Sequence, residues 1–204
     1  LPHELGSTGF GVYHSLLVAA KFAKLDINKS TVAIEGFGNV GVFAFKFLSE
    51  AGAKIIAVSD SKGMIYNKNG INLNELEKVK QESGSVVNYK NCEKKDSDKI
   101  IEVDADILIT AAIPDLIKPN DVNKLKFKLI VEGSNIPMSE ETERILYTKR
   151  TLVIPDIIAN AGGVISSYVE YKGGNEKEMF KLVEEKITKN VKHILELLID
   201  LYMF

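Results

Sequence analysis

The chain has 204 residues, of which 45% are hydrophobic and 26% are charged, which is ordinary for a globular protein of one or two domains with a sizeable core. A formal net charge of −2 excludes the basic surface that nucleic acids or anionic membranes attract. The single cysteine, Cys92, excludes an internal disulfide framework and a multi-cysteine zinc site.

The chain shows no targeting signal and no run of about 18 apolar residues that could span a membrane. The lone cysteine suits a reducing compartment, so we expect a cytoplasmic protein with neither a nucleic-acid nor a membrane partner. The sequence opens at Leu1 without an initiator Met. We therefore expect a piece of something longer.

The first quarter of the chain predicts a helix followed by a strand–helix–strand unit. Apolar residues at helical spacing predict a leading helix over residues 9–24, and short β-branched runs predict buried strands at 31–35 and 53–60. The segment 39–50 between these strands has a helical pattern. Two parallel strands joined by a helix make a βαβ unit.

The middle of the chain is more polar. Residues 62–71 resemble a turn-rich ribbon, in which Asn69 and Gly70 form a strong turn signal. An amphipathic helix is expected over 72–83, and the charged segment 87–99 is interpreted as an exposed connection.

Three more buried strands are expected in the second half of the chain, at residues 105–110, 128–133 and 151–156. A helix capped by Ser139 is predicted over 139–149, and the chain from about 160 to 200 is mostly helical. Five parallel strands with helical crossovers predict an α/β protein with a Rossmann-like, doubly wound, mostly parallel sheet and helices on both faces.

Three glycines follow the first strand and open the next helix. In this context Gly36 allows a tight turn, Gly38 lets the backbone approach a pyrophosphate, and Gly41 permits close packing of helix on strand. The amide groups of the helix start would then face the phosphates. The alternative is three packing glycines and an acid that caps a turn.

The acid is Asp60, which ends the second strand about 24 residues after Gly36, near the usual spacing of about 20 for a ribose-binding carboxylate. A carboxylate favours NAD because it accepts ribose hydroxyls and repels a 2′-phosphate. Ser61 and Lys62 follow at once, and both could hold that phosphate. The sequence leaves NAD, NADP or dual use open, with NAD slightly preferred.

No catalytic group is recognisable in the rest of the chain. The three histidines, His3, His14 and His193, are scattered, and neither a Ser/His/Asp grouping nor a metal-ligand cluster is visible. Binding a dinucleotide is not sufficient for catalysis, because a dehydrogenase also needs residues that hold the substrate and a group that transfers protons.

Five motifs in order, "STGFGV", "EGFGNVG", "ADILITAAIP", "IVEGSN" and "PDIIANAGGVISSYVEY", resemble the cofactor domain of the glutamate/leucine/phenylalanine/valine dehydrogenases, with glutamate dehydrogenase the most similar. The resemblance covers nearly the whole chain. It implies one dinucleotide-binding domain over residues 1–204, with residues 1–25 as a leading helix and 172–204 as a helical tail.

The resemblance also assigns roles to particular residues along the cofactor. Thr8 would bond the nicotinamide carboxamide, Asn135 would contact the nicotinamide-side ribose, and Asn160 would reach the carboxamide or the bound amino acid. Thr8, with Ser7, could instead cap a helix, and the two asparagines could instead satisfy loop backbones. The other residues implied along the cofactor are Gly36, Gly38, Asn39, Val40 and Gly41 at the pyrophosphate, Asp60, Ser61 and Lys62 at the adenosine ribose, and Ala111 and Ala112 in the cleft wall.

Val164 and Ser167, with Asn160, would form the substrate side. In this family a serine at the position of Ser167 accompanies glutamate, because a buried carboxylate needs donors, whereas an apolar substrate would leave the hydroxyl unpaired. The adjacent Ser166 could shift this frame, and helix serines often bond their own backbone.

The implied reaction is the reversible oxidative deamination of L-glutamate to 2-oxoglutarate and ammonia with NAD or NADP. In the family a lysine and an aspartate of an N-terminal domain handle proton transfer, and neither motif exists in this chain, so the chain alone is expected to bind cofactor without catalysing. The full-length protein is expected to be a homo-oligomer, and hexamers are common among relatives. The alternatives are a leucine, phenylalanine or valine dehydrogenase domain and a non-catalytic NAD(H)-sensing module.

Overall fold

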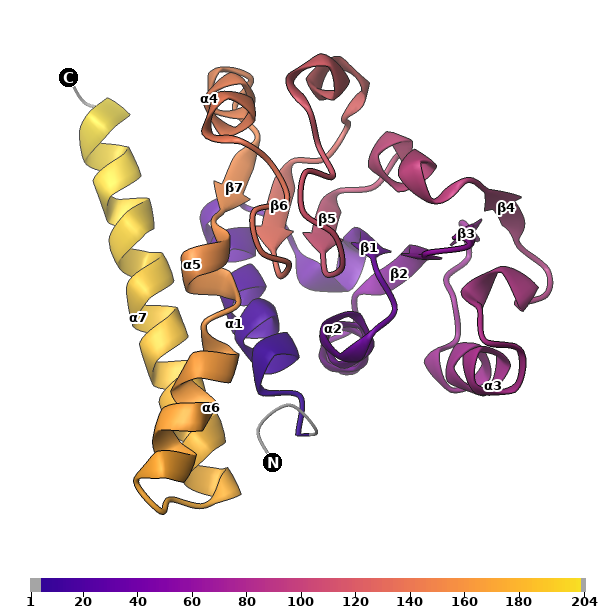
Figure 1. The fold of residues 1–204 in the computed structure, drawn as a ribbon. Coiled ribbons are helices and arrows are strands. Elements are labelled where there is room, and N and C mark those ends of the chain that lie inside the picture. Colours follow the sequence, from indigo (N-terminus) through magenta and orange to yellow (C-terminus); the bar gives the residue numbers. More distant parts are fainter. Residues whose placement is uncertain (1–4, 203–204) are drawn as a thin grey trace.

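The computed structural model describes residues 5–202 and shows one seven-stranded sheet with helices on both faces (Figure 1). The strand order is β4-β3-β2-β1-β5-β6-β7. The neighbours β2–β1, β1–β5, β5–β6 and β6–β7 pair in parallel. The strands are β1 (Thr31–Glu35), β2 (Lys54–Asp60), β3 (Gly63–Tyr66), β4 (Glu93–Lys95), β5 (Ile107–Thr110), β6 (Leu129–Glu132) and β7 (Leu152–Ile154). The five predicted parallel strands and the doubly wound fold class are therefore confirmed.

The helices also follow the predicted order, with boundaries that differ by a few residues. Ser139 caps α4 as predicted, because its hydroxyl accepts from the Thr142 N–H at 3.3 Å. The helices are α1 (Ser7–Phe22), α2 (Asn39–Glu50), α3 (Leu73–Ser83), α4 (Glu140–Thr148), α5 (Asp156–Ala159), α6 (Gly162–Tyr171) and α7 (Glu176–Tyr202). Short 3₁₀ turns add Ile27–Lys29, Val86–Asn88, Ser97–Glu102 and Pro119–Lys124.

The interpretation of residues 87–99 as a plain exposed connection was wrong in one respect. Its Glu93–Lys95 portion forms β4, which pairs antiparallel with β3 and makes the outer edge of the sheet. All its residues are exposed and charged, so the segment carries no apolar alternation from which a strand could be predicted. Charged side chains are a common feature of edge strands, because they discourage pairing with another chain.

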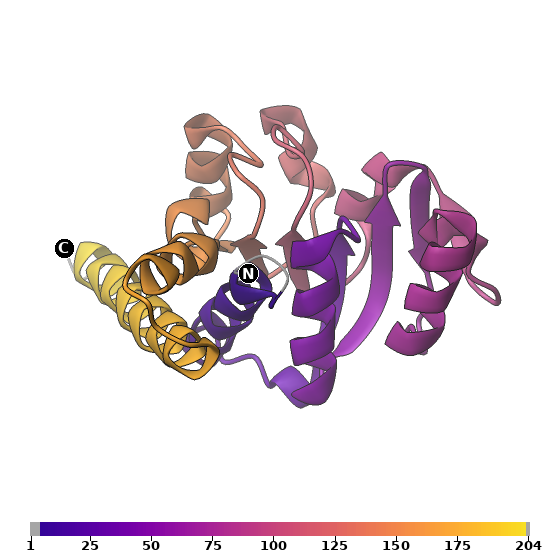
Figure 2. The same cartoon turned by 60° about the horizontal axis from the view of Figure 1, so that its bottom comes forward.

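Alternate residues of each central strand enter two separate apolar cores, which is why both faces need helices. In β1, Val32 and Ile34 face the core built with α1, α2 and α7, whereas Ala33 faces the core that includes Leu146 of α4. Helix α1 lies between α2 and the long α7 in both views (Figures 1 and 2). Because β1, β2, β5, β6 and β7 run parallel to one another, their carboxyl ends all lie at one edge of the sheet, which we call the rim.

Candidate functional site

Two of the three glycines after β1 are required by the protein's own packing. Gly36 has φ of 93°, and a Cβ there would lie 2.7 Å from the Ala112 Cβ. A Cβ on Gly41 would overlap the carbonyl oxygen of Gly36. At these two positions the packing interpretation of the motif is sufficient by itself.

Gly38 is different, because no contact among residues 5–202 explains why it lacks a side chain. A Cβ on Gly38 would meet no atom within 4 Å, its φ of −94° is accessible to any residue, and the position is exposed. It is the N-cap of α2 and supplies no side chain to cap that helix. The bare N-terminus of a helix at the carboxyl edge of a parallel sheet is the arrangement that binds phosphate groups.

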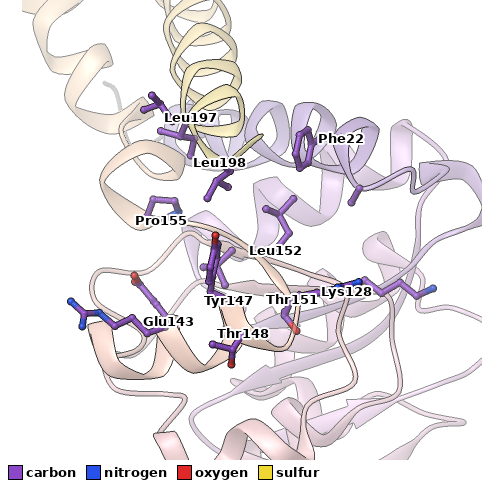
Figure 3. Close-up of a pocket in the computed structure, with 15 residues that line it drawn as sticks. Phe22, Lys128, Glu143, Tyr147, Thr148, Thr151, Leu152, Pro155, Leu197 and Leu198 are labelled. Atoms are coloured by element: carbon purple, nitrogen blue, oxygen red, sulfur yellow. The ribbon is translucent and has the colours of Figure 1, made fainter. Parts of the chain in front are cut away.

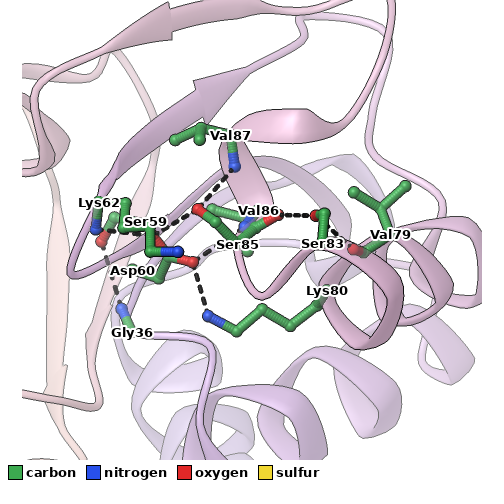
Figure 4. Close-up of polar contacts among 10 residues, drawn as sticks. All are labelled: Gly36, Ser59, Asp60, Lys62, Val79, Lys80, Ser83, Ser85, Val86 and Val87. Atoms are coloured by element: carbon green, nitrogen blue, oxygen red, sulfur yellow. Dashed lines mark hydrogen bonds and ion pairs between the residues drawn. The ribbon is translucent and has the colours of Figure 1, made fainter.

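Asp60, at the end of β2, is enclosed by donors from the protein itself (Figure 4). Lys80 Nζ donates to Oδ2 at 2.6 Å, and the Val86 N–H donates to the same oxygen at 2.9 Å. The Lys62 N–H and the Ser85 hydroxyl donate to Oδ1 at 2.9 and 3.1 Å. Burial alone would raise the pKa of Asp60, but the four hydrogen bonds outweigh it and hold the pKa below its usual value.

Lys80 and Ser85, which also bind Asp60, were not among the predicted site residues. They lie in and after α3, about 20 residues beyond the acid they bind, and such a separation follows no local spacing rule. Ser61 and Lys62, which were predicted there, are exposed beside Asp60.

Glu35, the last residue of β1, ties the glycine turn to the connection after β5. Its Oε2 accepts from the N–H groups of Ala111 and Ala112 at 2.9 and 3.0 Å, and its Oε1 accepts from Ile113 at 3.3 Å. Burial raises the pKa of Glu35 in spite of these bonds. The structure thereby places Ala111 and Ala112 directly against Gly36, on the same rim as Gly38.

Gly133 brings the connection after β6 onto the glycine motif. A Cβ there would lie 3.2 Å from a Val40 methyl, 3.1 Å from a Val12 methyl and 2.6 Å from the Thr110 carbonyl oxygen. Val40 is in the first turn of α2, so the segment that carries Asn135 begins beside the start of that helix.

Asn135 and Asn160 meet at the far end of the rim, where Asn160 Nδ2 donates to Asn135 Oδ1 at 2.7 Å. They come from the connections after β6 and after β7, and Asn135 is exposed. Their side chains thus bond one another, and the two predicted cofactor contacts form one polar group.

Thr8 lies against Gly162, two residues after Asn160, because a Cβ on Gly162 would be 3.2 Å from the Thr8 Cα. The alternative role of Ser7 or Thr8 as a helix cap was wrong. The N-cap of α1 is Gly6, with φ of 74° and no side-chain hydrogen bond, and both residues lie within the helix.

Glu132 is the second acid that sequence reasoning did not include. It ends β6 and is 1% exposed, its Oε2 accepts from the Asp156 N–H at 3.0 Å, and its Oε1 has no partner among the described residues. Burial, reinforced by repulsion from Glu143 and Asp156, raises its pKa to about 8. An acid directly after a buried strand, as here and at Glu35, was the available signal.

Helix α6 separates its two serines clearly. Ser166 is buried and Ser167 is exposed, on the same side as Val164 and Tyr168, so Ser167 is the hydroxyl that faces outward. The Ser167 hydroxyl donates to the Gly163 carbonyl oxygen at 3.1 Å, which is the local bonding common for helix serines.

A cavity of about 1130 Å³ lies away from these residues, between the outer edge of β7, α4 and the end of α7 (Figure 3). Phe22, Tyr147, Leu152, Leu197 and Leu198 give it an apolar lining, and none of the predicted site residues line it. Within residues 5–202 no group of three or more His, Cys, Asp or Glu side chains could hold a metal ion. No helix in that range is long and apolar enough to cross a membrane.

Comparison with known proteins gives a consistent result. Residues 2–203 match the Glutamate/Leucine/Phenylalanine/Valine dehydrogenase family. The chain is 44% identical to a glutamate dehydrogenase of Aeropyrum pernix, covering 95% of this chain and 50% of the relative. It is 43% identical to an NADP-specific glutamate dehydrogenase of Saccharolobus shibatae, covering 92% of this chain and 47% of the relative.

The fold also matches solved structures. A hetero-hexameric glutamate dehydrogenase from Thermus thermophilus superposes with a TM-score of 0.84 at 23% identity, covering 92% of this chain and 46% of that one. The chain thus spans about half the length of the relatives that it matches.

Proposed function

The chain belongs to the glutamate/leucine/phenylalanine/valine dehydrogenase family, and from that premise we propose that it is the dinucleotide-binding domain of a glutamate dehydrogenase. The bound nicotinamide would accept the hydride from Cα of L-glutamate in the reversible formation of 2-oxoglutarate and ammonia. The relatives that support glutamate as the substrate are named glutamate dehydrogenases and are 44% and 43% identical to this chain.

The observation that carries this proposal is the open space at Gly38. Of the three motif glycines, only this one has no packing reason to be glycine, and it lies at the bare start of α2. We propose that the pyrophosphate binds there, along Gly38, Asn39 and Val40. The nicotinamide half would then extend along the rim to Asn135, Asn160 and Thr8.

The chain would supply one wall of the catalytic cleft. Six of its large apolar side chains are more than half exposed on segments that follow β5, β6 and β7, namely Ile113, Ile136, Ile157, Val164, Tyr168 and Tyr171. Exposed apolar side chains on one rim mark a surface that another body covers. We propose that a second domain of the whole protein covers it and supplies the proton-transfer groups, and that the whole protein forms a homo-oligomer.

A steric series at the glycine motif tests cofactor binding. In Gly38→Val the added Cβ would stand in open space at the phosphate position, so NADH or NADPH affinity should fall at least about tenfold, while the loss of the glycine N-cap should lower stability by about 1 kcal/mol. The matched control, Gly41→Val, overlaps the Gly36 carbonyl and should lower the melting temperature as well. Affinity is read from the rise in NADH or NADPH fluorescence. Wild-type chain that does not respond to millimolar cofactor, or a Gly38→Val variant that binds normally, would contradict the proposal.

The cofactor preference that the structure supports differs from the slight preference for NAD predicted from Asp60. The four donors around Asp60 already occupy its carboxylate, which is therefore poorly placed to accept ribose hydroxyls. Lys80, exposed Lys62 and Ser61 adjoin it, and these groups suit a 2′-phosphate. We propose that the chain binds NADP at least as well as NAD, as the name of the Saccharolobus relative describes for that protein.

Lys80→Ala tests this preference. It removes a cation from the 2′-phosphate side and leaves Asp60 Oδ2 with the Val86 N–H as its only donor, so NADPH affinity should fall about tenfold while NADH affinity stays equal or rises. The control is Lys78→Ala on the same helix, because Lys78 is exposed and pairs only loosely with Glu82 at 3.9 Å. Equal losses for the two cofactors would refute the proposed role of Lys80.

The residues predicted to select the substrate, Val164 and Ser167, lie on α6. We propose that Ser167, which is exposed beside Val164, helps to hold the γ-carboxylate of glutamate by donating to it in place of the Gly163 carbonyl. In the whole protein, Ser167→Val should lower kcat/KM for glutamate more than for leucine. A preference for leucine or phenylalanine in the unmodified protein would instead favour the branched-chain or aromatic amino-acid enzymes of the family.

A further inference from the structure

The connections after β6 and after β7 are joined at two places on the rim. One is the bond between Asn135 and Asn160. The other is the Ile136 N–H, which donates to Asp156 Oδ2 at 2.7 Å. The second junction lies one residue from Asn135 and four from Asn160, so it is placed to set how the two asparagines approach.

Ile136 needs this support because its backbone is strained. Its φ is 48°, in the left-handed region that a β-branched side chain rarely adopts, and its side chain is 65% exposed, so side-chain burial does not compensate. What holds Ile136 is hydrogen bonding on both sides of the residue. Its N–H donates to Asp156, and its carbonyl accepts from the Asp115 N–H at 3.0 Å.

Asp156 is itself fixed at three points. Its N–H donates to Glu132 Oε2 at 3.0 Å, its Oδ1 accepts from the Ile157 N–H at 2.6 Å, and its Oδ2 accepts from Ile136. It is also the first residue of α5, whose C-cap is Asn160. One side chain therefore connects the strained residue beside Asn135 to the short helix that ends at Asn160.

We propose that Asp156 is the positioning residue for the nicotinamide end of the site: its carboxylate holds Ile136 in the strained conformation and so sets the geometry of the Asn135–Asn160 pair. This inference rests on the proposed function, and it adds a residue that touches neither cofactor nor substrate in it. Its consequence is selective. Loss of Asp156 should disturb the nicotinamide half and leave the phosphate and adenosine half, held around Gly38 and Asp60, unchanged.

Two ligands separate the halves, namely the reduced cofactor that the wild-type chain binds better and ADP-ribose, which lacks nicotinamide. In Asp156→Ala the cofactor should bind about tenfold more weakly, while ADP-ribose affinity changes by less than about twofold. Asp156→Asn keeps an oxygen that can accept from Ile136 and should recover most of the lost affinity. Glu185→Ala, on the exposed face of α7, also removes a carboxylate, one that pairs only loosely with Lys181 of the same helix, and should change the affinity for neither ligand.

Retained ADP-ribose binding shows that each variant is folded. If Asp156→Ala binds both ligands like wild type, or loses both to the same extent, the positioning role is refuted, and so it is if Asp156→Asn recovers nothing. If wild-type chain binds neither ligand, the proposed function fails and the inference fails with it. The two failures are therefore distinguishable in one set of titrations.

Discussion

Asp60 and Glu132 occupy equivalent places at the ends of two parallel strands, β2 and β6, yet they differ in charge. Each is the last residue of a parallel strand and each is buried. Four donors surround Asp60 and its pKa is lowered, whereas Glu132 accepts one hydrogen bond and its pKa is raised to about 8. Burial raises the pKa of both carboxylates. The donors around Asp60, with the Lys80 ammonium foremost, reverse this effect, whereas the acidic neighbours of Glu132 add to it.

The difference arises from what the chain places around each acid. After β2 the chain returns in antiparallel β3 and α3, which brings Lys80 and the amides near Val86 to Asp60. Around Glu132 the nearby charged groups are acids, Glu143 and Asp156. Asp60 is thus an ionised acid paired with Lys80, whereas Glu132 is a neutral acid bonded to the Asp156 N–H.

The largest effect that separates the two acids is expected in the free energy of unfolding at pH 7. Asp60→Ala leaves the Val86 N–H and the Lys80 ammonium without their acceptor, so it should cost about 3 kcal/mol. Glu132→Gln should not lower stability at pH 7, because wild type must take up a proton at Glu132 in order to fold, whereas the amide is neutral in both states. Urea unfolding of both variants measures this difference. Equal losses of stability would mean that Glu132, like Asp60, is ionised and paired in the folded protein.

The fold was predictable because its signals are local. Short apolar strands, the glycine motif and the Ser139 cap each lie within one segment, and the structure confirmed the fold class, the order of these elements and the cap. The Gly38 position was also recognisable, because the motif's spacing identifies it. These features follow from backbone geometry and side-chain periodicity alone.

The support of the site was not predictable, because it depends on contacts between distant segments. Lys80 reaches Asp60 across 20 residues of sequence and Glu35 binds amides more than 75 residues away. Asp156 binds Ile136, whose strained backbone has no sequence signature. Sequence spacing identifies groups that approach a ligand through a shared motif, but it does not identify the groups that hold those motifs in place.

The next effect concerns the pH dependence that Glu132 imposes. A folded-state pKa raised from 4.5 to about 8 means that the folded protein holds a proton that the unfolded chain releases. Stability should therefore be fullest below about pH 4.5 and fall as pH rises toward 8. Glu132→Gln removes this slope, so its stability relative to wild type should rise by about 4 kcal/mol between pH 5 and pH 9.

Thermal or urea unfolding at a series of pH values checks this slope. Glu35 also has a raised pKa, but it is present in both proteins and cancels in the difference. Parallel curves for wild type and Glu132→Gln would show that Glu132 titrates near its ordinary value. The opposite corner supplies a second comparison, because the contribution of Asp60 is present above its unfolded pKa and is lost only as pH falls through its lowered folded pKa.

The smallest effect comes from a single donor to Asp60. Ser85 is fully buried, its hydroxyl donates to Asp60 Oδ1 at 3.1 Å and accepts from the Val87 N–H at 3.3 Å. Ser85→Ala should cost about 1 kcal/mol, the usual contribution of one hydrogen bond. Its neighbour Ser83 is exposed and bonds only backbone carbonyls, so Ser83→Ala is the matched control.

Combining Ser85→Ala with Asp60→Ala tests whether the donors act through the carboxylate. Without the carboxylate, the hydroxyl loses its acceptor and keeps only the Val87 N–H. The second substitution should then cost about half as much as it does alone. Additive losses would mean that Ser85 stabilises the turn before Val86 independently of Asp60. In that case the lowered pKa of Asp60 would depend on Lys80 and the backbone amides, and the contrast with Glu132 would rest on them.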